Sequence, residues 1–311
     1  MVRSILVPLD GSTFGEHALP LAASLARKAD GVLHLIHVHQ VVPPATVAGV
    51  AIMDSLDIHL RQDEQAYLAD VARRVAQAGP INVKTALIDG EVGPALAEFA
   101  SRVGAELVVM STHGRGALGR FWLGSVTDDL VHELARPLLL VHPGEGKPDL
   151  GRSVELKNVV VALDGTSHAE KILDAAMLLG GVFGAAFTLV RVVQPVLRPS
   201  YLPEGTGIMG LTHSVLEQVQ TLQKQQQDEA QAYLDGVAPR LTGRGFRVQT
   251  RVVVDEQPAV GILLEAQARN AEVVALETHA RRGLARLFLG SVADKIVRGS
   301  GLSVLLAHPQ R

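Results

Sequence analysis

The sequence contains no cysteine, few aromatic residues (4%) and no long apolar run. The lack of cysteine excludes disulfides, thiolate zinc sites and a cysteine nucleophile, and it is typical of proteins from a reducing compartment. No apolar run approaches the ~20 residues that cross a bilayer. Near the start of the chain, Pro8 and Asp10 interrupt the apolar segment before a signal peptide could develop. We therefore expect a cytoplasmic protein.

The charge is nearly balanced, with 29 basic and 32 acidic residues and a net charge of −3. Because no basic excess exists to neutralise phosphates or anionic lipid, we expect neither nucleic acid nor a membrane surface as a partner. The chain has 311 residues, of which 47% are hydrophobic. This length and composition predict two globular domains, each with its own core.

An internal repeat supports the two-domain prediction. Residues 5–12 (ILVPLDGS) recur as residues 159–166 (VVVALDGT), which aligns Asp10 with Asp164 at an offset of 154. Later segments match at an offset of 166, so the second copy carries a 12-residue insertion between Val192 and Gln231. We predict domains at residues 1–143 and 158–311, joined by a polar linker at residues 144–157 that contains Gly and Pro.

Short β-branched runs alternate with helical patterns in both copies, which is typical of βαβ units and a parallel sheet. The expected strands of the first copy are residues 4–9, 31–38, 82–87, 107–111 and 138–142, and the expected helices are residues 14–29, 55–78, 93–103 and 126–135. Capping boxes are expected at Thr13 with Glu16, Ser167 with Glu170, Ser125 with Asp128, and Ser291 with Asp294. The predicted fold class is α/β, with two tandem doubly wound five-stranded parallel sheets of Rossmann-like type.

Three loops of the first copy follow the carboxyl ends of strands, where ligands bind in such sheets. They are residues 8–12, 37–40 and 111–119. The third loop has glycines that let the backbone approach a ligand closely, and Arg115 adds positive charge. Nine residues after Gly114, Gly124 and Ser125 open a helix whose free N–H groups form a second anion site. Two donor clusters at this spacing suit a chain of phosphates.

Together these motifs resemble the universal stress protein family in its tandem form. The resemblance rests on Asp10-Gly-Ser, on Val38 at the end of the second strand, on Thr112-His-Gly-Arg-Gly, on Gly124-Ser, and on residues 136–143 (RPLLLVHP). It implies domains of the adenine nucleotide alpha hydrolase-like fold, related by a pseudo-twofold axis. It also implies an adenine nucleotide, usually ATP and possibly with Mg²⁺, held without a dedicated catalytic apparatus.

The family's pattern also implies which residues touch the nucleotide. Asp10 would bond the ribose or adenine end, Val38 would present its backbone to adenine, and the glycine loop would hold the phosphates. The implied contact residues are Pro8, Leu9, Asp10, Val38, Ser111, Thr112, His113, Gly114, Arg115, Gly124, Ser125, Val126 and Thr127.

The second copy departs further from the family's pattern than the first. In the first copy Ser111 replaces one glycine, and its hydroxyl can still bond a ligand. In the second copy Glu277 and Ala280 replace both glycines, and a carboxylate beside a polyphosphate is repulsive. We therefore predict a nucleotide site in the first domain and a degenerate one in the second, at Asp164, Val192, Gly290, Ser291 and Val292.

Structural explanations compete with these assignments. Asp10 could serve only to order its own turn, and Gly124-Ser125 could be only a helix entry. His34 faces away from His37 and His39 on a strand, so we expect packed or solvated histidines and no metal site. Three functions stay open: a nucleotide-dependent stress sensor or regulator, a slow ATPase or phosphate-transferring enzyme, and an interaction module without nucleotide.

The last strand of each copy would leave an apolar edge, which is an aggregation hazard. The resemblance implies that these edges, residues 137–141 and 302–307, pair antiparallel, so that one chain is a self-contained pseudo-dimer. The apolar loops at residues 41–53 and 195–209 follow the second strands. They are either connectors or surfaces for further homodimerisation or for a protein partner.

Overall fold

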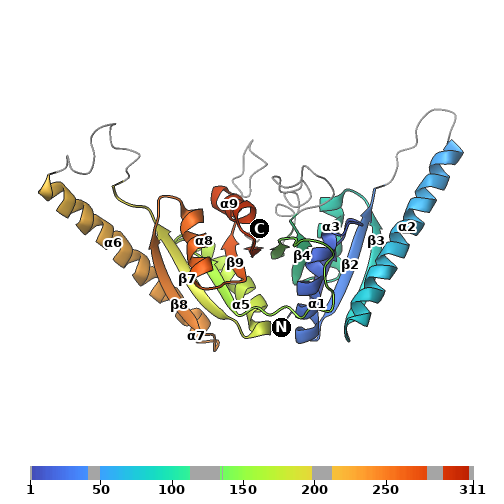
Figure 1. Cartoon of the computed structure of the whole chain (residues 1–311), viewed down its shortest axis with the longest axis horizontal. Coiled ribbons are helices and arrows are strands. Elements are labelled where there is room, and N and C mark those ends of the chain that lie inside the picture. The colour runs from blue at the N-terminus through green and yellow to red at the C-terminus, as the bar shows by residue number, and fades with distance from the viewer. Residues whose placement is uncertain are drawn as a thin grey trace.

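The computed structural model describes residues 2–40, 50–112, 134, 136–197, 212–278 and 290–307. Within these ranges the strands form one ten-stranded sheet in the order β3-β2-β1-β4-β5-β10-β9-β6-β7-β8. Figure 1 shows two similar halves that meet at the centre, with the long helices α2 (Val50–Gln77) and α6 (His213–Val237) at the outer ends.

The two halves repeat the same order of elements. The other elements of the first half are β1 (Ser4–Pro8), η1 (Gly15–Ala18), α1 (Leu19–Ala29), β2 (Val32–His39), β3 (Asn82–Asp89), α3 (Val92–Arg102), β4 (Leu107–Ser111) and β5 (Leu138–Val141). Those of the second half are β6 (Asn158–Ala162), η3 (Ala169–Lys171), α5 (Ile172–Phe183), β7 (Ala186–Val193), α7 (Pro239–Thr242), β8 (Val248–Val254), α8 (Pro258–Ala268), β9 (Val273–Glu277), α9 (Ser291–Gly299) and β10 (Ser303–Ala307). The predicted strands of the first copy are confirmed to within two residues.

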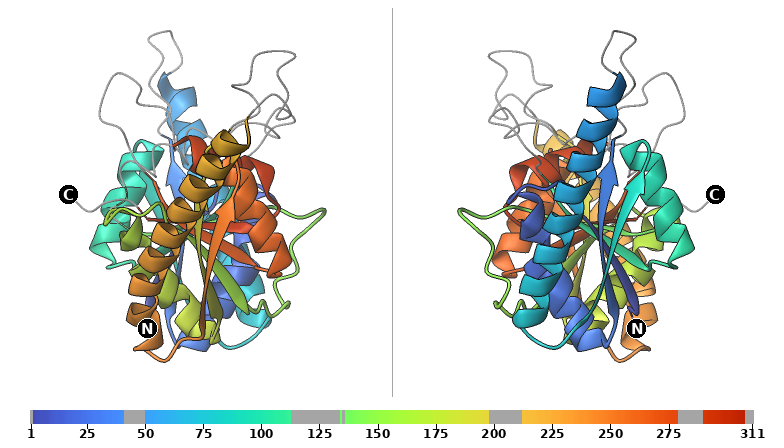
Figure 2. Two further views of the ribbon diagram at one scale, coloured as in Figure 1. Left: turned by 90° about the vertical axis from the view of Figure 1, so that its left-hand side faces the viewer. Right: turned by 90° about the vertical axis from the view of Figure 1, so that its right-hand side faces the viewer.

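The interiors of the central strands are apolar because helices cover both faces of the sheet. In β1, Ile5 and Val7 point into one core and Leu6 points into the other, as alternation along a strand requires. Figure 2 shows α1 and α2 on one face of the first half and α3 on the other. The core on the α1 side continues without a break into the second half.

The strand order creates a crevice in each half. β1 pairs in parallel with β2 on one side and with β4 on the other. Because the chain moves outward in opposite directions from β1, the carboxyl ends of β1 and β4 flank a point where the order reverses, and ligands bind at such points. In the second half, β6 lies between β7 and β9 in the same way.

The halves are joined by an antiparallel pair of strands, β5 and β10, which confirms the edge pairing expected above. Leu139 lies opposite Leu305, and both side chains are completely buried. Beneath this seam Lys28 on α1 forms an ion pair with Glu155 at 3.0 Å. The backbone N–H of Val154 donates to the Ser24 hydroxyl at 2.9 Å.

The predicted capping boxes are wrong wherever the structure describes them. The carboxylate of Glu16 binds the distant Arg74 guanidinium, which is a stronger partner than an exposed backbone N–H. Glu170 likewise binds Arg240 and accepts from the Tyr233 hydroxyl. A capping box would instead place each carboxylate against the backbone N–H at the start of its own helix.

The third described box fails for a different reason. Gly290 is the N-cap residue of α9, with a φ of 85° that favours glycine, and Ser291 is already inside the helix. The carboxylate of Asp294 binds Arg298 at 2.7 Å. The box at Ser125 and Asp128 lies outside the described residues, as does most of the helix expected at residues 126–135.

Two further expectations need adjustment. α2 begins at Val50, five residues before the predicted start, so the last residues of the expected loop 41–53 are helical. Residues 41–49 and 198–211, which make up most of the two expected apolar loops, lie outside the described residues. Within the described ranges, no helix is long and apolar enough to cross a membrane.

Candidate functional site

The crevice of the first half brings together the predicted site residues that the structure describes. Leu9 and Asp10 follow β1, Val38 lies near the end of β2, and Ser111 and Thr112 mark the end of β4. The Leu9 N–H donates to the Ile36 carbonyl at 2.8 Å, which extends the sheet toward the turn. Pro8 completes this group. His113, Gly114, Arg115, Gly124, Ser125, Val126 and Thr127 lie outside the described residues.

Asp10 orders the turn in which it lies. Its Oδ1 accepts from the Ser12 N–H at 2.9 Å and from the Ser12 hydroxyl at 2.6 Å. The Ser12 oxygen in turn accepts from the Gly15 N–H at 3.1 Å. A Cβ at position 15 would lie 2.6 Å from Asp10 Oδ1, so a larger residue there would displace this carboxylate. These bonds use one carboxylate oxygen, and the Asp10 side chain remains exposed toward the crevice end of β1.

Ser111 presents a buried hydroxyl at the same edge. The residue is 6% exposed, and its Oγ has no hydrogen-bond partner within the part of the chain that the structure describes. Leaving such a group unsatisfied costs about 1–3 kcal/mol. Most buried hydroxyls in proteins are satisfied, so an orphan calls for an explanation such as a ligand.

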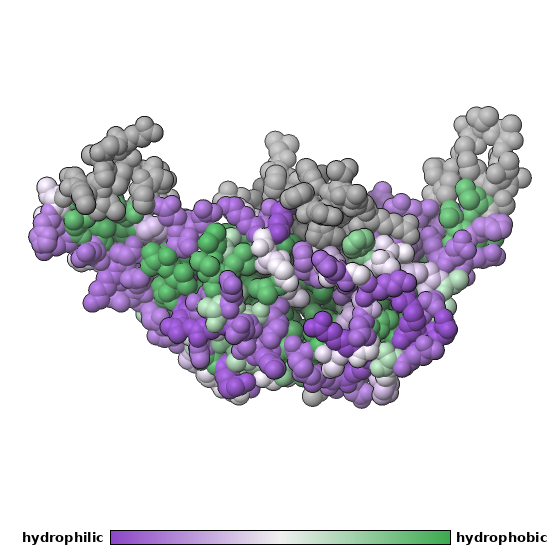
Figure 3. Space-filling model, in the orientation of Figure 1, coloured by the Kyte–Doolittle hydropathy of each residue, from purple (hydrophilic) through white to green (hydrophobic). Residues whose placement is uncertain are grey.

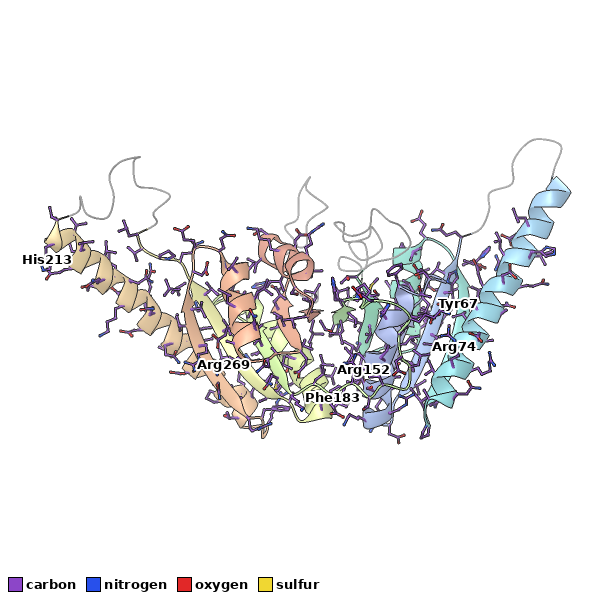
Figure 4. All side chains as sticks on the ribbon, in the orientation of Figure 1. Tyr67, Arg74, Arg152, Phe183, His213 and Arg269 are labelled. Carbon is purple, nitrogen blue, oxygen red and sulfur yellow. The ribbon has the colours of Figure 1, made fainter. Side chains whose placement is uncertain are left out.

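His37 supports the Asp10 turn through a hydrogen bond. Its Nδ1 donates to the Leu9 carbonyl at 2.8 Å, and its ring lies 6.5 Å from the Tyr67 ring on α2. Burial, together with the neighbouring Glu16 and Asp10 carboxylates, raises the pKa of Tyr67. Figure 4 shows Tyr67 and Arg74 on the side of α2 that faces the sheet.

The Glu16–Arg74 pair lies beneath the same turn. Arg74 Nη1 and Nη2 donate to the two Glu16 oxygens at 2.9 and 2.8 Å. The hydrogen bonds that Arg74 donates to Glu16 raise the pKa of the Arg74 guanidinium. Glu16 itself is 5% exposed. This pair fixes α2 to the start of the η1–α1 segment.

The histidines of β2 divide between the two faces as their parity predicts. His34 packs edge-on against Phe99, and burial lowers its pKa. His37 and His39 face α2. His39 is not merely packed or solvated, because both of its ring nitrogens contact carboxylates. Within the described residues, no group of three histidines or acids could hold a metal ion.

The crevice of the second half has a similar turn. Asp164 Oδ1 accepts from the Thr166 N–H at 2.8 Å and from its hydroxyl at 2.7 Å. Val192 lies near the end of β7, and the start of α9 supplies the remaining predicted residues. Those residues are Gly290, Ser291 and Val292.

The side chains around this second turn differ from those of the first half. Glu277, which is 7% exposed, ends β9 where the first half has Ser111. Arg191 takes the place of His37, and its guanidinium lies 5.2 Å from the centre of the Tyr233 ring. A Cβ on Gly165 would come within 2.7 Å of this guanidinium. Ala280, the other predicted change, lies outside the described residues.

Comparisons of the sequence with known proteins all point to one family. The family model described as the universal stress protein family matches residues 1–142 and 155–308. A universal stress protein of Mycobacterium tuberculosis is 25% identical over 315 residues, which are 98% of this chain and 97% of the relative. One of Methanocaldococcus jannaschii is 27% identical over 141 residues, 45% of this chain and 82% of the relative.

Solved structures match the fold over both halves. A universal stress protein from Archaeoglobus fulgidus superposes with a TM-score of 0.66 at 16% identity and covers 98% of each chain. A putative universal stress protein from Pseudomonas aeruginosa superposes with a TM-score of 0.56 at 16% identity, covering 99% of this chain and 94% of the other. The likeness supports the tandem arrangement of two α/β units.

Proposed function

The chain belongs to the universal stress protein family in its tandem form, and from this premise we propose that its first domain binds an adenine nucleotide. The expected ligand is ATP, alone or with Mg²⁺. In this proposal the protein is a cytoplasmic stress-response regulator that passes its nucleotide state to a protein partner. We place its domains at residues 1–143 and 158–311.

The observation that carries the proposal is the buried Ser111 hydroxyl at the end of β4. It lacks a partner in the described part of the chain and lies at the point where the strand order reverses. A phosphate or ribose oxygen would satisfy it. Asp10 and Val38, which end the two strands alongside, would hold the ribose and adenine ends.

The second domain is proposed to bind nucleotide weakly or not at all. Glu277 stands where the first domain offers a hydroxyl, and its side chain is buried. Two like charges at contact distance in a partly buried site repel each other strongly, since the interior screens them less than water does. A triphosphate would therefore meet repulsion at the position that attracts it in the first domain.

Calorimetric titration with ATP tests the proposal, with Asp10→Ala and Asp164→Ala as a matched pair. Both variants lose the same turn bonds, so only the ligand contact differs. We expect one site per chain. We expect Asp10→Ala to weaken binding by about tenfold, the effect of losing one good hydrogen bond to ligand, and Asp164→Ala to leave it unchanged.

The reciprocal exchange sharpens the test. Ser111→Glu should abolish binding in the first domain, while Glu277→Ser should relieve the repulsion in the second. Two equivalent sites in the wild type, loss of binding through Asp164→Ala alone, or no binding by either domain would overturn the proposal. The last of these results would favour an interaction module instead.

A further inference from the structure

A charged cluster lies at the end of β2, on the face covered by α2. His39 is 1% exposed, and its Nδ1 lies 2.7 Å from Glu64 Oε2 while its Nε2 lies 2.9 Å from Asp57 Oδ1. A carboxylate oxygen can only accept a hydrogen bond, so both ring nitrogens must donate. A histidine that donates from both nitrogens carries a proton on each. This geometry requires the imidazolium form.

The surrounding groups favour that charge. Arg61 donates through Nε to Asp57 Oδ2 at 2.8 Å and through Nη1 to Asp89 Oδ1 at 2.7 Å, on β3. Glu64 Oε1 also lies 3.4 Å from His37 Nε2. If His39 lost its proton, three carboxylates would face one guanidinium and the His37 ring.

The pKa shifts of His39 and Asp57 agree with a protonated His39. Burial lowers the pKa of His39, but the hydrogen bonds to Asp57 and Glu64 outweigh it, so the net pKa is raised above its ordinary 6.5. For Asp57, which accepts from His39, the hydrogen bond from Arg61 and then that from His39 lower the pKa to about 2.

Among its described residues the second half has no such cluster, although its backbone follows the same path. Tyr67 beside His37 and Tyr233 beside Arg191 show that the repeat offsets hold in space. At these offsets every charged member of the cluster on β2 and α2 is replaced by a neutral residue. The replacements are Val193 for His39, Gln223 for Asp57, Gln227 for Arg61 and Ala230 for Glu64.

The cluster also lies where α2 has little other attachment to the sheet. In its lower part, Leu68, Val71 and Val75 are buried in the core. Around the cluster, the apolar side chains of α2 point outward, and Leu56 and Ile58 are 46% and 53% exposed. Figure 1 shows the first turns of α2, which precede the cluster, beyond the ends of the strands. The ionic contacts therefore carry a large share of the attachment here.

We propose that His39, Asp57, Arg61 and Glu64 form a proton-dependent latch that holds the upper part of α2 against the ends of β2 and β3. A group whose pKa is raised in the closed state stabilises that state fully at a pH below its open-state pKa of about 6.5. The stabilisation is lost as the pH rises through the raised pKa. The latch is closed in mildly acidic solution and loosens toward alkaline pH.

Hydrogen exchange on the full-length protein tests the latch. The exchange rates of amides 57–64 in α2 are divided by those of the aligned amides 223–230 in α6, which cancels the chemical pH dependence of exchange. We expect a constant ratio below about pH 6.5. Above it the ratio should rise by about tenfold per pH unit until the raised pKa is reached, and then level off.

A matched variant carries the residues of the second half: His39→Val, Asp57→Gln, Arg61→Gln and Glu64→Ala. Its exchange ratio should not depend on pH. If this variant does not fold, Glu64→Gln serves instead, and the NMR titration midpoint of His39 should then fall toward 6.5. A wild-type midpoint at or below 6.5, a wild-type ratio independent of pH, or a pH-dependent ratio in the exchanged variant would overturn the proposal.

Discussion

Replacing Leu139 with aspartate is expected to lower the free energy of unfolding by about 5 kcal/mol. Leu139 is completely buried at the seam, opposite Leu305. The loss of a buried leucine side chain alone costs about 2–5 kcal/mol. A carboxylate without a counterion in the same place adds several more, which its protonation relieves only in part. Since domains are stable by about 5–15 kcal/mol, urea denaturation should show that the variant is only marginally stable.

The matched control is Leu264→Asp. Leu264 lies on α8 and is 56% exposed. Figure 3 shows apolar surface on this half, and Val260, one turn before Leu264 on α8, is also exposed. The same change in chemistry should therefore alter the free energy of unfolding by less than about 0.5 kcal/mol. Equal effects of the two substitutions would mean that the seam contributes nothing special to stability.

Replacing Arg74 with alanine is expected to cost about 2 kcal/mol. The substitution leaves the Glu16 carboxylate, which is 5% exposed, without its bidentate partner. Breaking a fully buried pair from one side costs about 3–5 kcal/mol, and we expect a cost below this range because the Arg74 side chain is 35% exposed. Denaturation in urea near neutral pH measures the loss.

The neighbouring Arg73→Ala is the control for this second prediction. Arg73 is 65% exposed and pairs with Asp70 on the surface of the same helix, so its loss should cost less than about 0.5 kcal/mol. A cost of Arg74→Ala no larger than that of Arg73→Ala would contradict the role given to the ion pair.

The parts of the fold that are predictable from the sequence depend on local patterns. The central strands of each half, such as β4 and β5, are short apolar runs, which is typical of strands buried on both faces. The offset of 154 aligns Asp10 with Asp164, and the two residues make the same turn. The pairing of β5 with β10 followed from the family resemblance and from the hazard of a bare apolar edge.

The features that escaped prediction depend on residues far apart in the chain. Glu16 fits a capping pattern, but its partner Arg74 is 58 residues away. His39 meets acids that are 18 and 25 residues further on. A signal was present, since Asp57, Arg61 and Glu64 share one face of a helix through their i, i+4 and i+7 spacing. Only the packing of that face on β2 reveals the cluster. The nucleotide contacts themselves stay a prediction.

The antiparallel seam between β5 and β10 holds at low protein concentration. Two separate subunits joined through such an edge would dissociate on dilution. Here both edges belong to one polypeptide, so each meets the other at a high effective concentration that the tether alone sets. The pairing of the two edges therefore does not depend on how many molecules a cell contains, and even a few molecules each form the full sheet.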